Sequence, residues 1–191
     1  MKKTILTILT MTLITSSCAP VLIAGGTTAA YDERTLSTIY QDEGITHQAL
    51  GLINENESFK DSNINVISIN NIALLVGQVP NNITKELATK EVRSIPEVKK
   101  VYNQITIGKT TSALTRSNDT WITTKVKAAM LAENGVQSTQ VKVLTENGVV
   151  YLLGIVTDEE ANLAANVTKN IKGVKKVVKL FQIKKEENKQ E

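Results

Sequence analysis

The chain has 191 residues, and its 22 basic and 19 acidic residues leave a formal net charge of +3. This length allows one domain of ordinary size or two small ones. A hydrophobic content of 41% is enough to build a packed core. The weak net charge lacks the concentrated basic field that general nucleic-acid binding requires, so we expect no nucleic-acid partner.

The first residues have the pattern of an export signal. Two lysines start the chain, and an uncharged, mostly apolar run follows over residues 5–14. This run is about half as long as the roughly 20 residues that span a bilayer, but it has the length of a signal-peptide core. Small residues then precede Cys18, the only cysteine. They resemble the lipobox of bacterial lipoproteins, although Thr15 stands where that motif usually has leucine.

The lipobox resemblance implies that residues 1–17 are a signal peptide and that Cys18 carries a lipid anchor. The alternative is an ordinary secretory signal followed by a free thiol, which invites intermolecular pairing in an oxidising compartment. Residues 18–41 include a run of glycine, threonine and alanine typical of a flexible tether. By resemblance to the sorting rule of enteric lipoproteins, Ala19 implies the outer membrane, with the protein facing the periplasm.

The remainder of the chain is an internal repeat. A shift of 77 residues places 75–79 on 152–156, and a shift of 76 places 95–101 on 171–177. Repeats of this kind decide the domain organisation. The predicted organisation is a first domain over 42–108, a Thr/Ser-rich linker over 109–118, a second domain over 119–184 and a charged tail over 185–191.

Each copy begins with a predicted helix. Apolar residues recur at positions i, i+4, i+7 and i+8, the spacing of one buried helical face. These residues are Ile45, Ala49, Leu52 and Ile53 in copy one, and Ile122, Val126, Ala129 and Met130 in copy two. Glu133 falls on the buried sector of the second of these helices, so we expect that helix to end before it.

Two strands, a second helix and a last strand complete each copy. In copy two, strands over 141–145 and 149–156 are joined through Asn147-Gly148, the strongest short hairpin signal. Thr157 and Glu160 form a capping box that predicts the start of the second helix. The last strands are expected over 98–107 and 174–183. The predicted fold class is α+β: two tandem small domains, each a three-stranded mixed sheet packed on two helices.

One glycine lies near the end of the second strand in both copies. Gly77 and Gly154 fall on each other in the 77-residue shift. A glycine in a strand marks a bulge or a close approach of another backbone, and we favour that structural role over a ligand contact.

The second copy carries three segments that resemble the BON domain, the bacterial osmotic-protection and nodulation domain. These are Asp119-x-Trp121-Ile122-Thr123, the strand end over 153–156, and Ile171-x-Gly173-Val174. Copy one lacks the tryptophan and has Glu97 in place of the last glycine. A lipobox followed by two such domains resembles the dual-BON outer-membrane lipoproteins. The resemblance implies binding of anionic phospholipid through the second domain and support of outer-membrane integrity. A related periplasmic protein has two such domains and no anchor.

The residue inventory argues against catalysis. His47 is the only histidine and Cys18 the only cysteine, so a His/Cys cluster for zinc or another transition metal cannot be built, and a histidine-based triad would have to use His47. We expect His47 to be a surface or half-buried residue without a catalytic role. The acidic run over 158–160 favours the positive end of the helix dipole, a structural role. We therefore expect no enzyme, no catalytic residue, no metal site and no cofactor.

The outer face of the first helix differs between the copies. At 100° per residue, the apolar core residues of copy two lie on one side of the helix, and a second set lies on the other. This second set contains Trp121, Lys125, Ala128, Leu131 and Ala132, while the corresponding positions of copy one are Gly44, Gln48, Gly51, Asn54 and Glu55. A tryptophan suits the headgroup level of a bilayer. The alternative is that Trp121 packs against copy one.

Charge favours an anionic surface as the partner of copy two. Residues 161–185 contain seven lysines and no acid, whereas 84–108 contain five basic residues and three glutamates. Each lysine near an anionic membrane is worth about 1 kcal/mol. A solvated basic face is the plainer interpretation of the lysines alone. The predicted lipid-binding residues are Trp121, Lys125, Lys127, Ala128, Leu131 and Ala132.

Two rival functions remain for the same residues. In one, Trp121 and Leu131 form a hot spot for an envelope protein partner, because tryptophan is enriched at such sites. In the other, the chain is an unlipidated periplasmic protein of the osmotic or envelope stress response.

Overall fold

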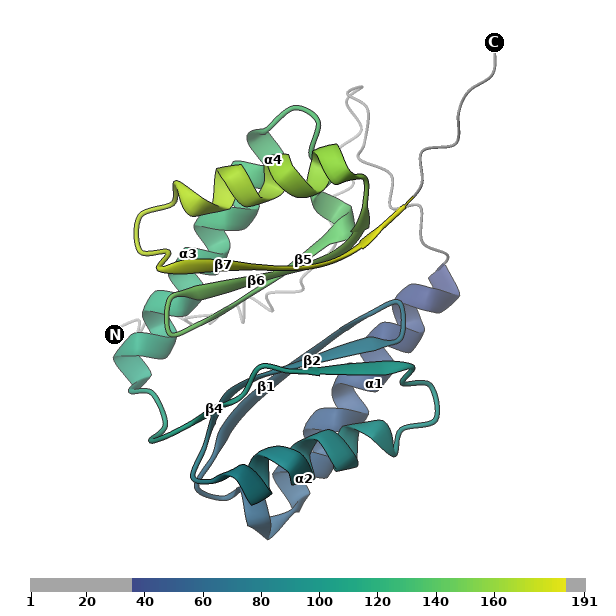
Figure 1. Ribbon diagram of the computed structural model, residues 1–191, viewed down its shortest axis with the longest axis vertical. Helices are drawn as coiled ribbons and strands as arrows, with labels where there is room; N and C mark the ends of the chain where they lie inside the picture. The colour runs from purple at the N-terminus through teal and green to yellow at the C-terminus, as the bar shows by residue number, and fades with distance from the viewer. Residues whose placement is uncertain (1–35, 185–191) are drawn as a thin grey trace, which may run out of the picture.

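The computed structural model describes residues 36–184, which form two units of the same α+β fold (Figure 1). The first unit contains α1 (Leu36–Glu55), a short 3₁₀ turn (Glu57–Phe59), β1 (Asn63–Ile69), β2 (Ile72–Val79), α2 (Asn82–Arg93), β3 (Lys100–Asn103) and β4 (Thr106–Ile107). The second contains α3 (Ala113–Ala132), a 3₁₀ turn (Ser138–Gln140), β5 (Val141–Glu146), β6 (Val149–Val156), α4 (Asp158–Lys169) and β7 (Lys176–Ile183). The predicted fold class is confirmed.

Each sheet is mixed, with the second strand of the unit at its centre. β2 pairs antiparallel with β1 and parallel with β3, and β6 pairs antiparallel with β5 and parallel with β7. The single strand expected over 98–107 is divided in two, because the Asn103 side chain accepts a hydrogen bond from the Ile105 amide (3.0 Å) and donates one to the Lys85 carbonyl (2.8 Å). The Gln104 amide still donates to the Leu75 carbonyl of β2 (2.8 Å), so the ladder is interrupted only after Gln104, and the chain rejoins β2 as β4.

The two β-hairpins are held by buried aspartates from the preceding helices. Asn147 and Gly148 have positive φ values of 49° and 77°, as a tight two-residue turn requires. The Asp119 carboxylate accepts hydrogen bonds from both turn amides, at 2.7 and 2.8 Å. Asp42 does the same for the amides of the 70–71 turn, at 2.8 and 2.9 Å. The same device therefore joins helix to hairpin in both domains.

Close packing of backbone explains the glycine shared by the two central strands. A Cβ atom on Gly77 would lie 1.8 Å from the carbonyl oxygen of Asn63, and one on Gly154 would lie 2.6 Å from that of Gln140. Both distances are too short for any side chain. The expected close approach of another backbone is confirmed at both positions.

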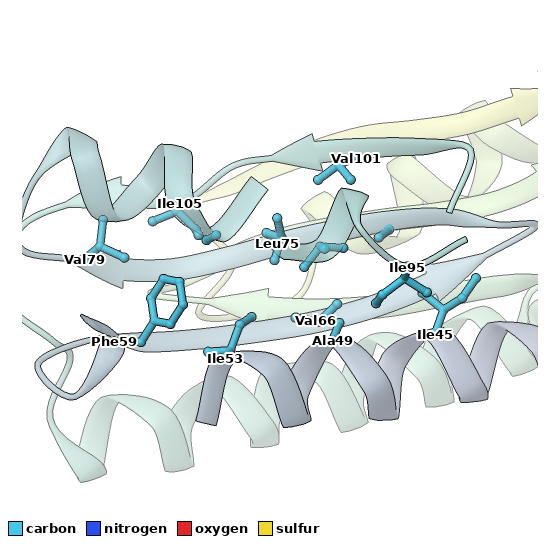
Figure 2. Close-up of a cluster of buried hydrophobic side chains, with 13 residues drawn as sticks. Ile45, Ala49, Ile53, Phe59, Val66, Leu75, Val79, Ile95, Val101 and Ile105 are labelled. Atoms are coloured by element: carbon cyan, nitrogen blue, oxygen red, sulfur yellow. The ribbon is translucent and has the colours of Figure 1, made fainter. Parts of the chain in front are cut away.

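The predicted helical faces form the two domain cores. Figure 2 shows Ile45, Ala49 and Ile53 of α1 directed towards Val66 and Leu75 of the sheet. In the second domain Ile122, Val126 and Met130 are buried in the same way, while Ala129 and its counterpart in the first domain, Leu52, are half-buried. The predicted capping box is present at the start of α4. The start of α3 also has a cap, because the Ser112 hydroxyl accepts a hydrogen bond from the Thr115 amide.

Helix boundaries differ from the expected ones at two places. α3 begins at Ala113, inside the expected linker 109–118, because Ser112 supplies its N-cap. α1 is already helical at Leu36, inside the expected tether 18–41. At the other end, α3 stops at Ala132, so the expected termination before Glu133 is confirmed. Cys18 and the tail over 185–191 lie outside the described residues.

The two sheets pack face to face, with α1 and α2 on the outer side of one and α3 and α4 on the outer side of the other (Figure 1). The buried residues between the sheets are Ile69, Leu74, Val76, Tyr151 and Leu153. Glu146 joins the domains through hydrogen bonds from Gln78 (2.7 Å) and Asn65 (3.1 Å). The central strands β2 and β6 are consequently covered on both faces, by their own helices and by the other sheet.

Candidate functional site

The outer side of α3 carries exposed apolar side chains. Trp121 is 61% exposed and Leu131 is 72% exposed, because the core positions of the helix point the opposite way. Ala128 and Ala132 are exposed beside them, as sequence spacing predicted. The alternative in which Trp121 packs against the first domain is wrong, since the two sheets, and not α3, form the domain interface. We call Trp121, Ala128, Leu131 and Ala132 the α3 face.

Leu114 extends the α3 face by two turns. It is 81% exposed and lies seven residues before Trp121, which places both on nearly the same side of the helix. Sequence reasoning missed Leu114 because it assigned this residue to the linker. The signal that would have found it is Ser112, a good N-cap residue at the start of the longer helix.

The two lysines of α3 that are predicted to bind lipid have different environments. The Lys125 ammonium donates a hydrogen bond to the carbonyl of Lys172 at 2.6 Å and lies 6.0 Å from the centre of the Trp121 ring. This is the outer limit of a cation–π contact. Lys125 therefore ties α3 to the connection before β7 and sits beside the indole. Lys127 is exposed on the other flank, next to β5.

The second domain carries a group of exposed lysines, one of which, Lys172, is held beside the α3 face by the hydrogen bond from Lys125. The group consists of Lys169, Lys172, Lys175, Lys176 and Lys179. Lys175 donates to Asn147 at 3.1 Å and Lys179 to Asn162 at 3.3 Å, both neutral acceptors. Through Lys125, the backbone of Lys172 is held next to Trp121. The positive charge of the second domain therefore begins at the edge of the apolar face.

The first domain has no comparable face at the same place. Gln48, Asn54 and Glu55 are exposed at the positions of Lys125, Leu131 and Ala132, and glycines stand at the positions of Trp121 and Ala128. Exposed apolar side chains on α1 are confined to its first turns, at Leu36 and Tyr40. His47 is exposed on this helix, the surface position expected for it.

Over residues 36–184, no helix is both long and apolar enough to cross a bilayer. Within the same residues, no three His, Cys, Asp or Glu side chains are grouped so that they could hold a metal ion.

The fold and the α3 face define a class of protein: a pair of small α+β domains joined sheet to sheet. The outer side of the first helix is apolar in the second domain and polar in the first domain. The BON domain pattern matches residues 41–109 and 118–185. The chain belongs to the BON-domain family, whose members of this kind are typically non-catalytic.

Three relatives share most of their length with the chain. It is 38% identical to the outer membrane lipoprotein DolP of Haemophilus influenzae, covering 94% of this chain and 95% of that one. It is 36% identical to a 21 kDa hemolysin of Actinobacillus pleuropneumoniae, covering 82% and 81%. It is 30% identical to the osmotically-inducible protein Y of Escherichia coli, covering 71% and 69%.

Proposed function

We propose that the chain is a non-catalytic lipoprotein of the outer membrane that faces the periplasm, docks on anionic phospholipid through the α3 face and supports membrane integrity. The observation that carries this proposal is the exposure of Trp121 and Leu131 on a helix whose core does not need them. Similarity to an outer membrane lipoprotein over nearly the whole chain supports the location and the anchor at Cys18.

The sizes of the interactions favour a membrane as the partner. Full burial of a large apolar side chain is worth about 1.5–3 kcal/mol, and Trp121, Leu131 and Leu114 can insert together. Each nearby lysine adds about 1 kcal/mol at an anionic surface. Stable attachment generally needs two signals, so the α3 face would complement the acyl anchor and fix the orientation of the domains on the membrane.

Vesicle binding by the chain with Trp121→Ala and Leu131→Asn tests the docking face. We expect binding to vesicles of phosphatidylcholine with phosphatidylglycerol to fall by at least about tenfold, because two inserted side chains are lost. The fold should remain intact, since both residues are exposed. The matched control is Gln48→Ala, at the position of Lys125 in the first domain, and it should leave binding unchanged.

Intrinsic fluorescence gives a second measurement, because Trp121 is the only tryptophan. Its emission should move to the blue on addition of anionic vesicles, and high salt should reverse the shift. Vesicles that bind without any change in emission would show that α3 is not the docking element. Absence of binding to any pure lipid would favour the rival function, in which Trp121 and Leu131 contact an envelope protein.

Replacement of the anchor residue tests the location. Cys18→Ser should release the mature chain from the membrane fraction or leave an unprocessed precursor. Mass spectrometry that finds a free Cys18 thiol in the wild-type mature protein would contradict the anchor and favour the unlipidated stress-protein alternative, which the similarity to the osmotically-inducible protein Y supports.

A further inference from the structure

The second domain has an open strand edge. β5 is the outer strand of its sheet, and its pairing with β6 fixes which of its backbone groups face outwards. Because Glu146 and Val149 flank a two-residue turn, they exchange both hydrogen bonds, and every second pair along the hairpin does the same. The amides and carbonyls of Val141, Val143 and Thr145 therefore point away from β6. Among residues 36–184, the Val141 amide donates to the Ser138 carbonyl of the 3₁₀ turn, whereas the outward groups of Val143 and Thr145 have no hydrogen-bond partner.

A groove runs along this edge. It consists of two adjoining hollows of about 520 and 490 Å³, which share Lys127. α3 forms one wall, α1 and β1 form the other, and β5 lies between them along its whole length. From β1 only Asn65 and Ile67 reach the groove, and their own backbone groups pair with β2. The strand edge that the groove offers is therefore that of β5.

The two walls differ in chemistry. On the α3 wall, Arg116 and Lys127 are exposed cations, and Leu131 is an exposed apolar side chain at one end. On the side that faces the first domain, Ile67 of β1 and Leu144 of β5 are half-buried apolar side chains.

The acidic groups along the groove already have partners. Asp119 holds the hairpin turn, and Glu146 accepts hydrogen bonds from the first domain. Glu43 forms an ion pair with Lys142 at 2.7 Å. The charge that remains for a ligand is positive, on the α3 wall.

We propose that this groove binds an extended segment of another protein, which adds to β5 as a further strand. A row of outward amides and carbonyls at strand spacing matches another polypeptide backbone. A lipid offers no alternating donors and acceptors and would leave the amides unsatisfied. Side chains of an added strand alternate between the two walls. The segment would carry acidic residues towards Lys127 and apolar residues towards Ile67 and Leu144. This inference does not depend on lipid docking.

A synthetic ten-residue peptide of alternating glutamate and valine is the probe. The protein is the full mature chain with Cys18→Ser, which keeps it in solution. We expect amide hydrogen exchange measured by NMR to slow by about tenfold or more at Val143 and Thr145 when the peptide is added at millimolar concentration, because both amides gain partners. The Leu144 amide, already paired with β6, should change little.

Two sets of controls test whether binding depends on backbone pairing with β5 and on the charge of Lys127. Two versions of the same peptide carry methyl groups on alternate backbone nitrogens, one on the glutamates and one on the valines. The version whose methyl groups point towards β5 should lose binding, because its donors are removed, and the other should still bind. Lys127→Glu should weaken the unmodified peptide by at least about fivefold, and Lys127→Ala by less. Lys90→Glu, an exposed lysine of α2 outside the groove, should have no effect.

The proposal is overturned if 2 mM peptide leaves the exchange of Val143 and Thr145 unchanged, or if both N-methylated peptides bind as well as the parent. A peptide of alternating lysine and valine that binds as tightly would likewise overturn the assignment of the acidic partner.

Discussion

The first helices of the two domains, α1 and α3, are alike on their inner sides and different on their outer sides. Both direct apolar residues into a core and hold the adjacent hairpin through an aspartate, Asp42 or Asp119. On the outer side, α3 carries Trp121 where α1 carries Gly44. The fold therefore constrains only one side of this helix. The outer side is free to acquire a function in one copy without cost to the structure of the other.

The largest effect that we expect is a loss of stability when the buried aspartate that both domains share is replaced. Asp42→Ala and Asp119→Ala each remove the acceptor of two turn amides, and an unsatisfied buried donor costs about 1–3 kcal/mol. We expect each change to lower the free energy of unfolding by about 2–4 kcal/mol in urea denaturation. A loss at one position with none at the other would show that the two domains do not share this device.

At the domain interface, the second copy has an ionisable residue where the first copy has an apolar one, so the contribution of this position to stability depends on pH. Tyr151 occupies the place that Leu74 occupies in the first domain, and both are buried between the sheets. Burial raises the pKa of Tyr151 above its usual value of 10.0, and the nearby charge of Glu146 raises it further. Folding therefore favours the neutral phenol.

The resulting stability is complete below about pH 10 and is lost as pH rises from there through the raised pKa, at no more than about 1.4 kcal/mol per pH unit. Unfolding free energies measured from pH 9 to pH 11.5 should show this decline, and Tyr151→Phe should remove it. An unchanged decline in the variant would assign it to the lysines instead.

The smallest effect concerns the outer side of α1. Gly44 and Gly51 lie in the helix with open space around them, where α3 has Trp121 and Ala128. Alanine at either position should raise stability by about 0.5–1 kcal/mol, because it restricts the unfolded chain. Thermal unfolding measures this gain, and vesicle binding should not change. Destabilisation by either alanine would mean that α1 is closely covered on this side.

Local signals in the sequence were sufficient for the elements of the fold. The turn at Asn147-Gly148 and the capping box of Thr157 and Glu160 involve residues within four positions of each other, and both are present. The internal repeat predicted the same order of helices and strands for the first domain. The lipid-binding residues stay a prediction, although the structure brings the apolar ones to one exposed face.

Contacts between distant segments were not predicted. The hydrogen bonds of Asp42 and Asp119 join residues 28 and 29 positions apart, and the Gln78–Glu146 bond joins residues 68 apart. No local pattern shows such pairs. One signal was available: the centre of β2, Ala73-Leu74-Leu75-Val76, is apolar at successive positions, which indicates burial of both faces of a strand.

Burial of both sheet faces has a consequence for how the protein is made. The first domain is synthesised before the second is complete, and until then Leu74, Val76 and Ile69 face water. An exposed apolar sheet face with open edges favours aggregation. A chain in which only the first domain is complete is therefore a natural client for chaperones. Either domain expressed alone should self-associate through this face unless Leu74 or its counterpart is replaced by a charged residue.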